Sequence, residues 1–218
     1  MADRADLTRR RGIPFACRQG ALFNRPAPRH AAPRQTIRSR PRMYPLIRVA
    51  LAMRAARKMP PLAPGEVHTI RTRCWPWDID PFMELNNGRT MTLMDIGRLP
   101  LALRTGLLSM LKREGWRMTM AGASVQYRRR VPPFAPMEIR SRAVGRDDKF
   151  IYIEHVTLTR GVPAHNAIYR AAVVDKDGIV HTDRVAVSLG RTDWAPSLPD
   201  WVAAWSEAEK LRPWPPEM

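Results

Sequence analysis

Two hydrophobic periods divide the chain into regions of different predicted structure. Residues 44–58 and 87–114 carry apolar side chains at helical spacing, the second as one long helix with Leu93, Ile96, Leu103 and Leu107 on one side. The sequence predicts a strand at 67–75. After residue 116 apolar and β-branched residues gather in short runs, which predict further strands at 116–131, 137–146, 150–160 and 164–174.

Prolines, glycines and polar clusters predict where these elements end. Pro60 and Pro61 close the first helix, because a residue before proline avoids the helical conformation. Pro100 predicts a kink or a split in the long helix, and Gly115 predicts its end. Hairpin turns are expected at 146–149 and 175–178, a short strand at 179–184 and a last helix at 198–211.

The predicted order is a strand, a long helix and then a run of strands joined by short turns. One long helix against a mostly antiparallel sheet is an α+β arrangement. We expect four regions in the 218 residues: a disordered leader at 1–42, an amphipathic helix and linker at 43–65, the main domain at 66–190, and a C-terminal helix and tail at 191–218.

Charge changes this picture at the N-terminus. The chain has a formal net charge of +17, and residues 1–42 hold eleven arginines against two aspartates. The leader fits a targeting peptide, a nucleic-acid-binding arm or a start codon placed too early, since Met43 begins a cleaner pattern. Nucleic acid is not an expected partner, because the leader lacks interleaved aromatic residues and a known binding module.

The segment at 44–58 is also basic. Leu46, Val49, Ala50 and Met53 lie on one predicted face, and Arg48, Arg54, Arg57 and Lys58 lie elsewhere. Such a helix can contact an anionic membrane, or it can pack against its own domain. No apolar run reaches the roughly 18 residues that a membrane span needs.

Most signatures of catalysis are missing from the sequence. Glycine-rich phosphate loops, serine elbows and histidine pairs at metal spacing are absent, so we expect no metal and no cofactor. Cys17 and Cys74 form no disulfide framework, which favours a reducing, cytoplasmic location. Cys74 is expected to be buried and structural, and the five scattered histidines to be strand or surface residues.

The stretch WPWDIDPFMELNNGR at 75–89 is the best candidate site. Asp78 and Asp80 precede a predicted helix N-terminus, where unpaired N–H groups favour an anion and can polarise a carbonyl oxygen. A carboxylate there could act as a general base or a nucleophile. The alternative is that Asp78, Asp80 or Asn86 only caps the helix.

The same stretch, followed by Asp95 and Arg98, resembles the hotdog-fold acyl-CoA thioesterases of the 4-hydroxybenzoyl-CoA thioesterase type. Their pattern is Asp-x-Asp, a Gly-His step, Asn-Asn, and a helix with Tyr, an acid and Arg. The runs at 125–130 (VQYRRR) and 145–150 (GRDDKF) are similar to the THEM-type branch of that superfamily. The resemblance covers about 66–190 and implies a hotdog fold, a long helix wrapped by an antiparallel sheet.

The resemblance also implies roles for individual residues. Asp80 corresponds to the catalytic carboxylate, which attacks an acyl-CoA thioester or activates water, and Asn87 and Gly88 would bind its carbonyl oxygen. The supporting residues are Asp78, Glu84, Asn86 and Asp95. This chain departs from the family pattern at two positions, with Glu84 in place of the histidine and Thr90 in place of the tyrosine.

Arginine supplies a further expectation. Arg128, Arg129 and Arg130, with Lys149 behind them, can bind the phosphates of coenzyme A. They can equally be charges that protect a sheet edge. The resemblance implies a homodimer or larger assembly. The alternative function is that of a non-catalytic acyl-CoA-binding or lipid-binding protein that contacts a membrane through residues 44–58.

Overall fold

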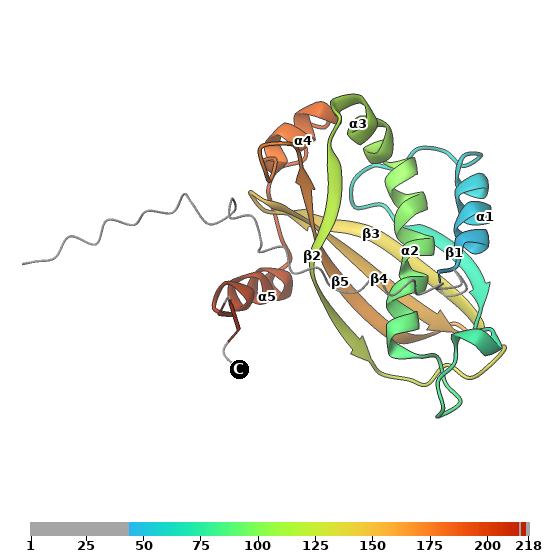
Figure 1. Cartoon of the computed structure of the whole chain (residues 1–218). Coiled ribbons are helices and arrows are strands. Elements are labelled where there is room, and N and C mark those ends of the chain that lie inside the picture. The colour runs from blue at the N-terminus through green and yellow to red at the C-terminus, as the bar shows by residue number, and fades with distance from the viewer. Residues whose placement is uncertain (1–43, 214, 217–218) are drawn as a thin grey trace, which may run out of the picture. The chain divides into compact units, whose positions relative to one another are not determined.

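Five antiparallel strands form one sheet that curves around a central helix (Figure 1). The computed structural model describes residues 44–213 and 215–216, so the predicted leader lies outside the described residues. The strand order is β1-β3-β4-β5-β2. The strands are β1 (His68–Arg73), β2 (Arg117–Tyr127), β3 (Pro136–Arg146), β4 (Phe150–Thr159) and β5 (Val162–Val174).

The central helix confirms the long predicted helix but breaks at a different residue. It consists of α2 (Asn87–Arg104) and α3 (Leu107–Glu114). Pro100 stays inside α2, and the chain turns instead at Gly106, which has a φ of 79°. Glycine reaches this left-handed conformation without the cost of a Cβ. Gly115, with a φ of 68°, ends α3 as predicted.

Helix α2 packs on the concave face of the sheet. Met94 and Leu101 are buried with Ile153 of β4 and Tyr169 of β5 in one core cluster. Leu93 and Ile96 are buried with Ile139 of β3 in another. At Gly97 the helix crosses β3 so closely that an added Cβ would lie 2.3 Å from Ser141 Oγ. This close crossing sets the height of α2 over the sheet.

Helix α1 (Leu46–Ala56) packs beside α2 at the β1 edge, so the interpretation of a helix on its own domain is confirmed. The predicted apolar face was partly wrong. Val49 and Ala52 are half-buried and Ala56 is buried, whereas Leu46 and Ala50 are exposed. Packing on α2 selects the face at 49, 52 and 56, which leaves other aliphatic residues in solvent.

The C-terminal part differs from the sequence prediction at one element. Residues 179–184 do not form a strand: Ile179 makes a single bridge to Val174, and α4 (Thr182–Ser188) begins directly after His181. His181 Nδ1 accepts a hydrogen bond from the N–H of Asp183 and caps the helix. Val185 and Ala186 are then buried on one helical face.

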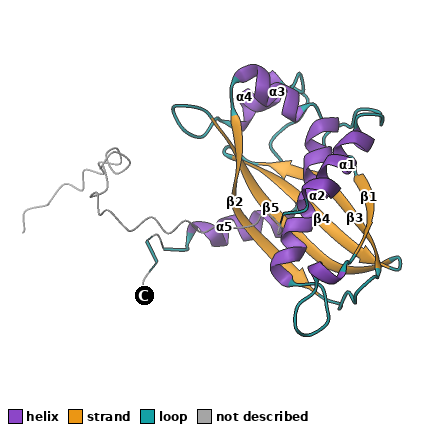
Figure 2. Ribbon diagram, turned by 45° about the vertical axis from the view of Figure 1, so that its right-hand side comes forward, coloured by secondary structure: helices purple, strands orange, loops and turns teal. Residues whose placement is uncertain are grey.

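Helix α5 (Asp200–Lys210) lies on the opposite face of the sheet from α2 (Figures 1 and 2). Val202 is buried there with Tyr152 and Ile168, and Trp205 packs edge-on against the Tyr152 ring. Both faces of the middle of the sheet are therefore covered. Among the described residues, no helix combines the length and the apolar character that crossing a membrane requires.

Candidate functional site

Asp78 is buried and both of its oxygens are held in ion pairs. Oδ2 lies 2.7 Å from Arg48 Nη2, and Oδ1 lies 2.7 Å from Arg89 Nε. The N–H of Trp75 donates to Oδ2 at 3.0 Å. The carboxylate thus joins α1, the loop before α2 and the first turn of α2. This geometry gives Asp78 a structural role and leaves it no free face for a substrate.

Asp80 is held differently, in a tight turn at 80–84. Its Oδ1 accepts hydrogen bonds from the N–H groups of Phe82 at 2.9 Å and Glu84 at 3.4 Å. The N–H of Asp80 donates to the carbonyl of Glu84 at 2.8 Å, and Met83 takes a left-handed φ of 58° to close the turn. Within the described residues, Oδ2 makes no hydrogen bond. One oxygen of Asp80 is therefore without a hydrogen bond among the described residues, and Asp80 is not among the residues that line the depression beside α2.

The N-terminus of α2 is capped by Asn86, as one of the sequence interpretations held. Asn86 Oδ1 accepts from the N–H of Arg89 at 3.0 Å. The N–H groups of Asn87 and Gly88 precede the first carbonyl that a helix can offer them, so they are free for an external acceptor. A Cβ on Gly88 would find only Asn86 Oδ1 within 4 Å, at 3.4 Å, so the surface above this residue is open.

A depression of about 210 Å³ opens beside this helix start. Its residues come from the loop before α2, the start of α2, the loop after β2 and the first part of β5. Tyr127 donates from its hydroxyl to the carbonyl of Asn87 at 3.1 Å and lies edge-on to the ring of His165 at 5.2 Å. The lining polar residues are Glu84, Asn87, Tyr127, Arg128, Arg129, Arg130 and His165.

His165 is the residue that sequence reasoning missed. It is 5% exposed, and its Nε2 donates to the carbonyl of Arg129 at 3.1 Å. Burial lowers the pKa of this imidazole, while the hydrogen bond to the Arg129 carbonyl and the Glu84 carboxylate oppose the shift, so the ring is mostly neutral near pH 7. The sequence pattern that could have identified His165 is the alternation of faces along β5. His165 shares a strand face with Ala167 and Tyr169, which lie beneath α2.

Glu84 and the arginines form the outer wall of the depression. Arg130 Nε lies 2.5 Å from Glu84 Oε2, so Glu84 carries a partner for its charge. The predicted strand 116–131 is too long, since β2 ends at Tyr127 and the N–H groups of Arg128 and Arg129 both donate to the carbonyl of Ala164. All three arginines therefore belong to a loop and line one depression. On a strand, neighbouring side chains would point to opposite faces and could not all line it.

Three predicted residues lie elsewhere. Lys149 occupies the β3–β4 turn, at the opposite end of β4 from the arginines, so it does not stand behind them. Asp95 is paired with Arg98 farther along α2 and accepts from the Tyr44 hydroxyl at 3.0 Å. Cys74 is fully buried, as expected, and burial together with the nearby Asp78 carboxylate raises its pKa to about 11.

Comparison with known protein families establishes the family of this chain. The family model of the thioesterase-like superfamily matches residues 74–206, more than half of the chain. The chain belongs to the thioesterase-like superfamily. This match confirms the resemblance drawn from residues 78–98, and the matched range contains α2, the whole depression and four of the five strands.

The chain is also similar to individual relatives named Protein THEM6. The chain is 29% identical over 148 residues to Protein THEM6 of Drosophila melanogaster, which covers 66% of this chain and 74% of the relative. It is also 29% identical over 145 residues to Protein THEM6 of Xenopus laevis, covering 63% of this chain and 68% of the relative.

Solved structures share the fold. YbaW, a "probable thioesterase" from Escherichia coli, superimposes with a TM-score of 0.53 at 13% identity over 57% of this chain and 97% of its own. A hypothetical protein from Aquifex aeolicus gives a TM-score of 0.51 at 11% identity over 56% of this chain and 98% of its own. The α+β hotdog fold is thus confirmed.

Proposed function

We propose that this protein hydrolyses acyl-CoA thioesters at the N-terminus of α2. The observation that carries the proposal is the N–H end of α2, where Asn87 lines a depression together with His165, Glu84 and three arginines, and the neighbouring Gly88 lines the adjoining hollow. Two backbone N–H groups at a helix N-terminus stabilise an oxyanion as it forms on a thioester carbonyl. The general activity of the superfamily agrees with this chemistry.

Asp80 is the carboxylate that we assign to the reaction. It attacks the thioester carbonyl or removes a proton from an attacking water. Either route breaks the carbon–sulfur bond, and coenzyme A leaves as the thiolate, which takes up a proton. If Asp80 attacks, a water molecule then hydrolyses the acyl anhydride formed on Asp80, which releases the free acid and restores the carboxylate. The free Oδ2 of Asp80 supports this assignment, whereas Asp78 has both oxygens in ion pairs. Asn86 supports the site by capping α2, whereas Asp95 pairs with Arg98 farther along the helix and has no part in the proposed reaction.

The arginine loop is the proposed binding surface for the phosphates of coenzyme A. Arg128 and Arg129 have exposed side chains at the mouth of the depression, and their backbone is fixed by two hydrogen bonds to Ala164. Arg130 is also exposed but pairs with Glu84. Guanidinium groups match phosphate oxygens in bidentate geometry.

We further propose that the protein works as a homodimer through the free edge of β2. This strand ends the sheet order, has eleven residues and is largely exposed. A long unpaired strand edge invites pairing with another chain. Small side chains at Ala121, Gly122 and Ala123 allow two such edges to approach.

A second candidate function is non-catalytic binding of acyl-CoA or lipid at a membrane surface. One observation favours it: the outward face of α1 exposes Leu46, Ile47 and Leu51, at 60%, 78% and 62%, next to Arg54, Arg57 and Lys58. Aliphatic side chains beside cations suit an anionic bilayer. In a flotation assay, Ile47→Glu would release the protein from anionic vesicles, and wild type that ignores such vesicles would contradict the contact.

The two functions are separated by an assay of thiol release from a panel of acyl-CoAs, with calorimetry on the same samples. Hydrolysis predicts free thiol from at least one acyl-CoA. Binding heat without any thiol would reject hydrolysis and support the second candidate.

A further inference from the structure

A second cavity lies at the far end of α2 from the proposed reaction site. It has a volume of about 340 Å³ and lies between the end of α2, the start of α3, β3, β4 and the loop after α4. This size falls within the range of roughly 300–1,000 Å³ that small-molecule sites occupy. About thirteen residues of α2 separate Gly88 from Leu101, or about 20 Å along the helix axis. A small ligand in the cavity would not reach Asp80.

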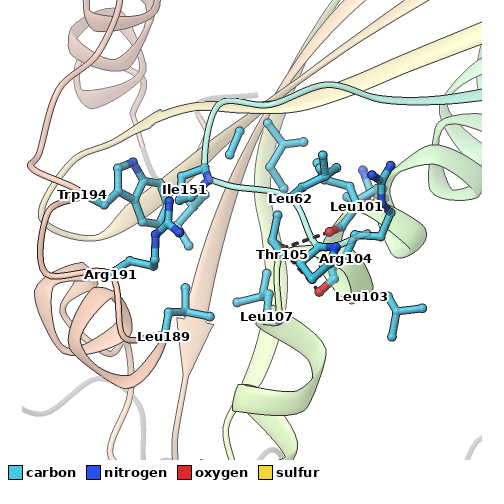
Figure 3. A pocket seen from close by; sticks show the side chains of 17 residues that line it. Leu62, Leu101, Leu103, Arg104, Thr105, Leu107, Ile151, Leu189, Arg191 and Trp194 are labelled. Atoms are coloured by element: carbon cyan, nitrogen blue, oxygen red, sulfur yellow. Dashed lines mark hydrogen bonds between the residues drawn. The ribbon is translucent and has the colours of Figure 1, made fainter. Parts of the chain in front are cut away.

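Apolar side chains form most of the cavity wall. Leu189 comes from the loop after α4 and faces Leu107 across the cavity, with Leu62 and Leu101 on the side of α2 (Figure 3). Ile151 contributes from β4 on the sheet side. An alkyl chain placed here would lose water on several sides, which is the main source of affinity for such ligands.

The walls are fixed by hydrogen bonds, so the cavity is preformed. The N–H of Leu62 donates to the carbonyl of Arg104 at 3.0 Å, and Arg104 Nε donates to the carbonyl of Pro60 at 2.9 Å. On the opposite side, the carbonyl of Trp194 accepts from Arg146 Nε at 2.8 Å. The linker at 60–64 and the loop at 189–194 are therefore both tied to the body of the domain. A rigid site binds with less loss of conformational entropy.

Two guanidinium groups supply positive charge to this apolar space. Arg98 and Arg191 both line the cavity. Arg98 pairs with Asp95, and Arg191 Nε lies 3.7 Å from Asp193 Oδ1, beyond hydrogen-bond reach. In the described part of the chain, Arg98 Nη1 and Arg191 Nε are buried atoms with no hydrogen-bond partner. A buried donor without an acceptor is costly, and an anionic ligand would remove that cost.

We propose that this cavity binds a single-chain fatty carboxylate, with its alkyl chain among Leu62, Leu101 and Leu107 and its carboxylate on Arg191. The site is separate from the thioester site and would hold a free acid whether or not that acid comes from the proposed hydrolysis. A planar carboxylate is the acceptor that guanidinium groups match best.

Calorimetric titration with decanoate and decanol tests the site, because the two probes share a chain and differ in charge. Wild type is expected to bind decanoate about tenfold or more tightly than decanol, since a charge-assisted hydrogen bond contributes at that scale. Arg191→Gln should remove most of this difference while leaving decanol within about twofold of wild type. Arg191→Lys should restore part of it.

Three further variants make the result specific to the cavity. Leu189→Trp fills the apolar space and should abolish binding of both probes. Arg71→Gln removes an arginine whose side chain is 86% exposed on β1, outside the cavity, and should bind like wild type. Asp80→Asn should also bind decanoate normally, which separates this site from the proposed reaction site.

Equal affinities for decanoate and decanol in wild type, or unchanged binding in Leu189→Trp, would overturn the proposal. Binding of decanoate that disappears in Asp80→Asn would overturn it as well, because the ligand would then occupy the thioester site. Thermal melts followed by circular dichroism show that each variant is folded before its titration is interpreted.

Discussion

Asp78 and Asp80 are two residues apart and have opposite environments. Asp78 is buried between two arginines whose side chains are only 16% and 13% exposed, whereas Asp80 closes a turn and keeps a free oxygen. The sequence spacing could not tell them apart. The difference comes from Arg48, which reaches Asp78 from a helix thirty residues earlier in the chain.

This difference predicts opposite effects of the same substitution. Asp78→Asn leaves two buried guanidinium groups without their shared counter-charge, so the free energy of unfolding should fall by about 3 kcal/mol. Asp80→Asn should cost less than about 1 kcal/mol, because an amide oxygen still accepts from the turn. Urea unfolding measures both. Equal losses in the two variants would show that Asp80 has a structural role of the same size.

His155 predicts how stability depends on pH. It is completely buried, and burial, with Arg98 nearby, lowers its pKa to about 3, while its Nδ1 lies 2.8 Å from Ser141 Oγ. The unfolded chain takes up this proton near pH 6.5 and the folded chain does not, so stability is retained above that pH and falls below it.

Between about pH 7 and pH 5, His155 alone should cost about 2 kcal/mol. His68, whose pKa burial lowers to about 4, adds to the same loss. Urea unfolding across this range should show a shallower pH slope for His155→Gln than for wild type. An identical slope in the two proteins would contradict a neutral buried imidazole.

At the scale of elements, the hydrophobic period predicted most of the fold. The four long strands and the central helix follow directly from it, because burial on one face imposes the pattern. The prediction of a strand at 179–184 was wrong, because the His181 cap and a short apolar face favour the helix α4 there. The break at Gly106 was missed because Pro100 is the stronger local signal.

The candidate site was harder to predict than the fold. Asn86, Asn87 and Gly88 are contiguous, so their place at the helix start could be inferred from the sequence. His165 and the arginine loop join them only through the pairing of β2 with β5, which places Tyr127 opposite His165. Local patterns do not determine such long-range pairing.

Two glycines in α2 make a matched test of its packing. Gly97→Ala places a Cβ against Ser141 Oγ, and this clash should outweigh the helical preference of alanine, with a net loss of about 2 kcal/mol. Gly88→Ala meets open surface and should leave stability nearly unchanged, yet its methyl group would crowd a bound thioester. Thermal melts that rank the two variants in the reverse order would contradict the close crossing of α2 over β3.

At the scale of the whole molecule, the free edge of β2 predicts a dimer. Light scattering after size exclusion should give about twice the mass of one chain. Ala123→Lys should shift it toward the monomer, because it places like charges across the paired edges. Arg71→Gln, on the β1 edge, serves as the control. A wild type that stays monomeric at high concentration would reject the proposed interface.

The most direct test of the proposed function is the rate of thiol release from acyl-CoA by wild type and Asp80→Asn. Wild type should release thiol, and Asp80→Asn should lower kcat/KM by about a hundredfold or more, since its amide can neither attack nor take a proton. Asp177→Asn, in the exposed turn after β5, should behave like wild type. An Asp80→Asn protein that is as active as wild type would contradict the role assigned to Asp80.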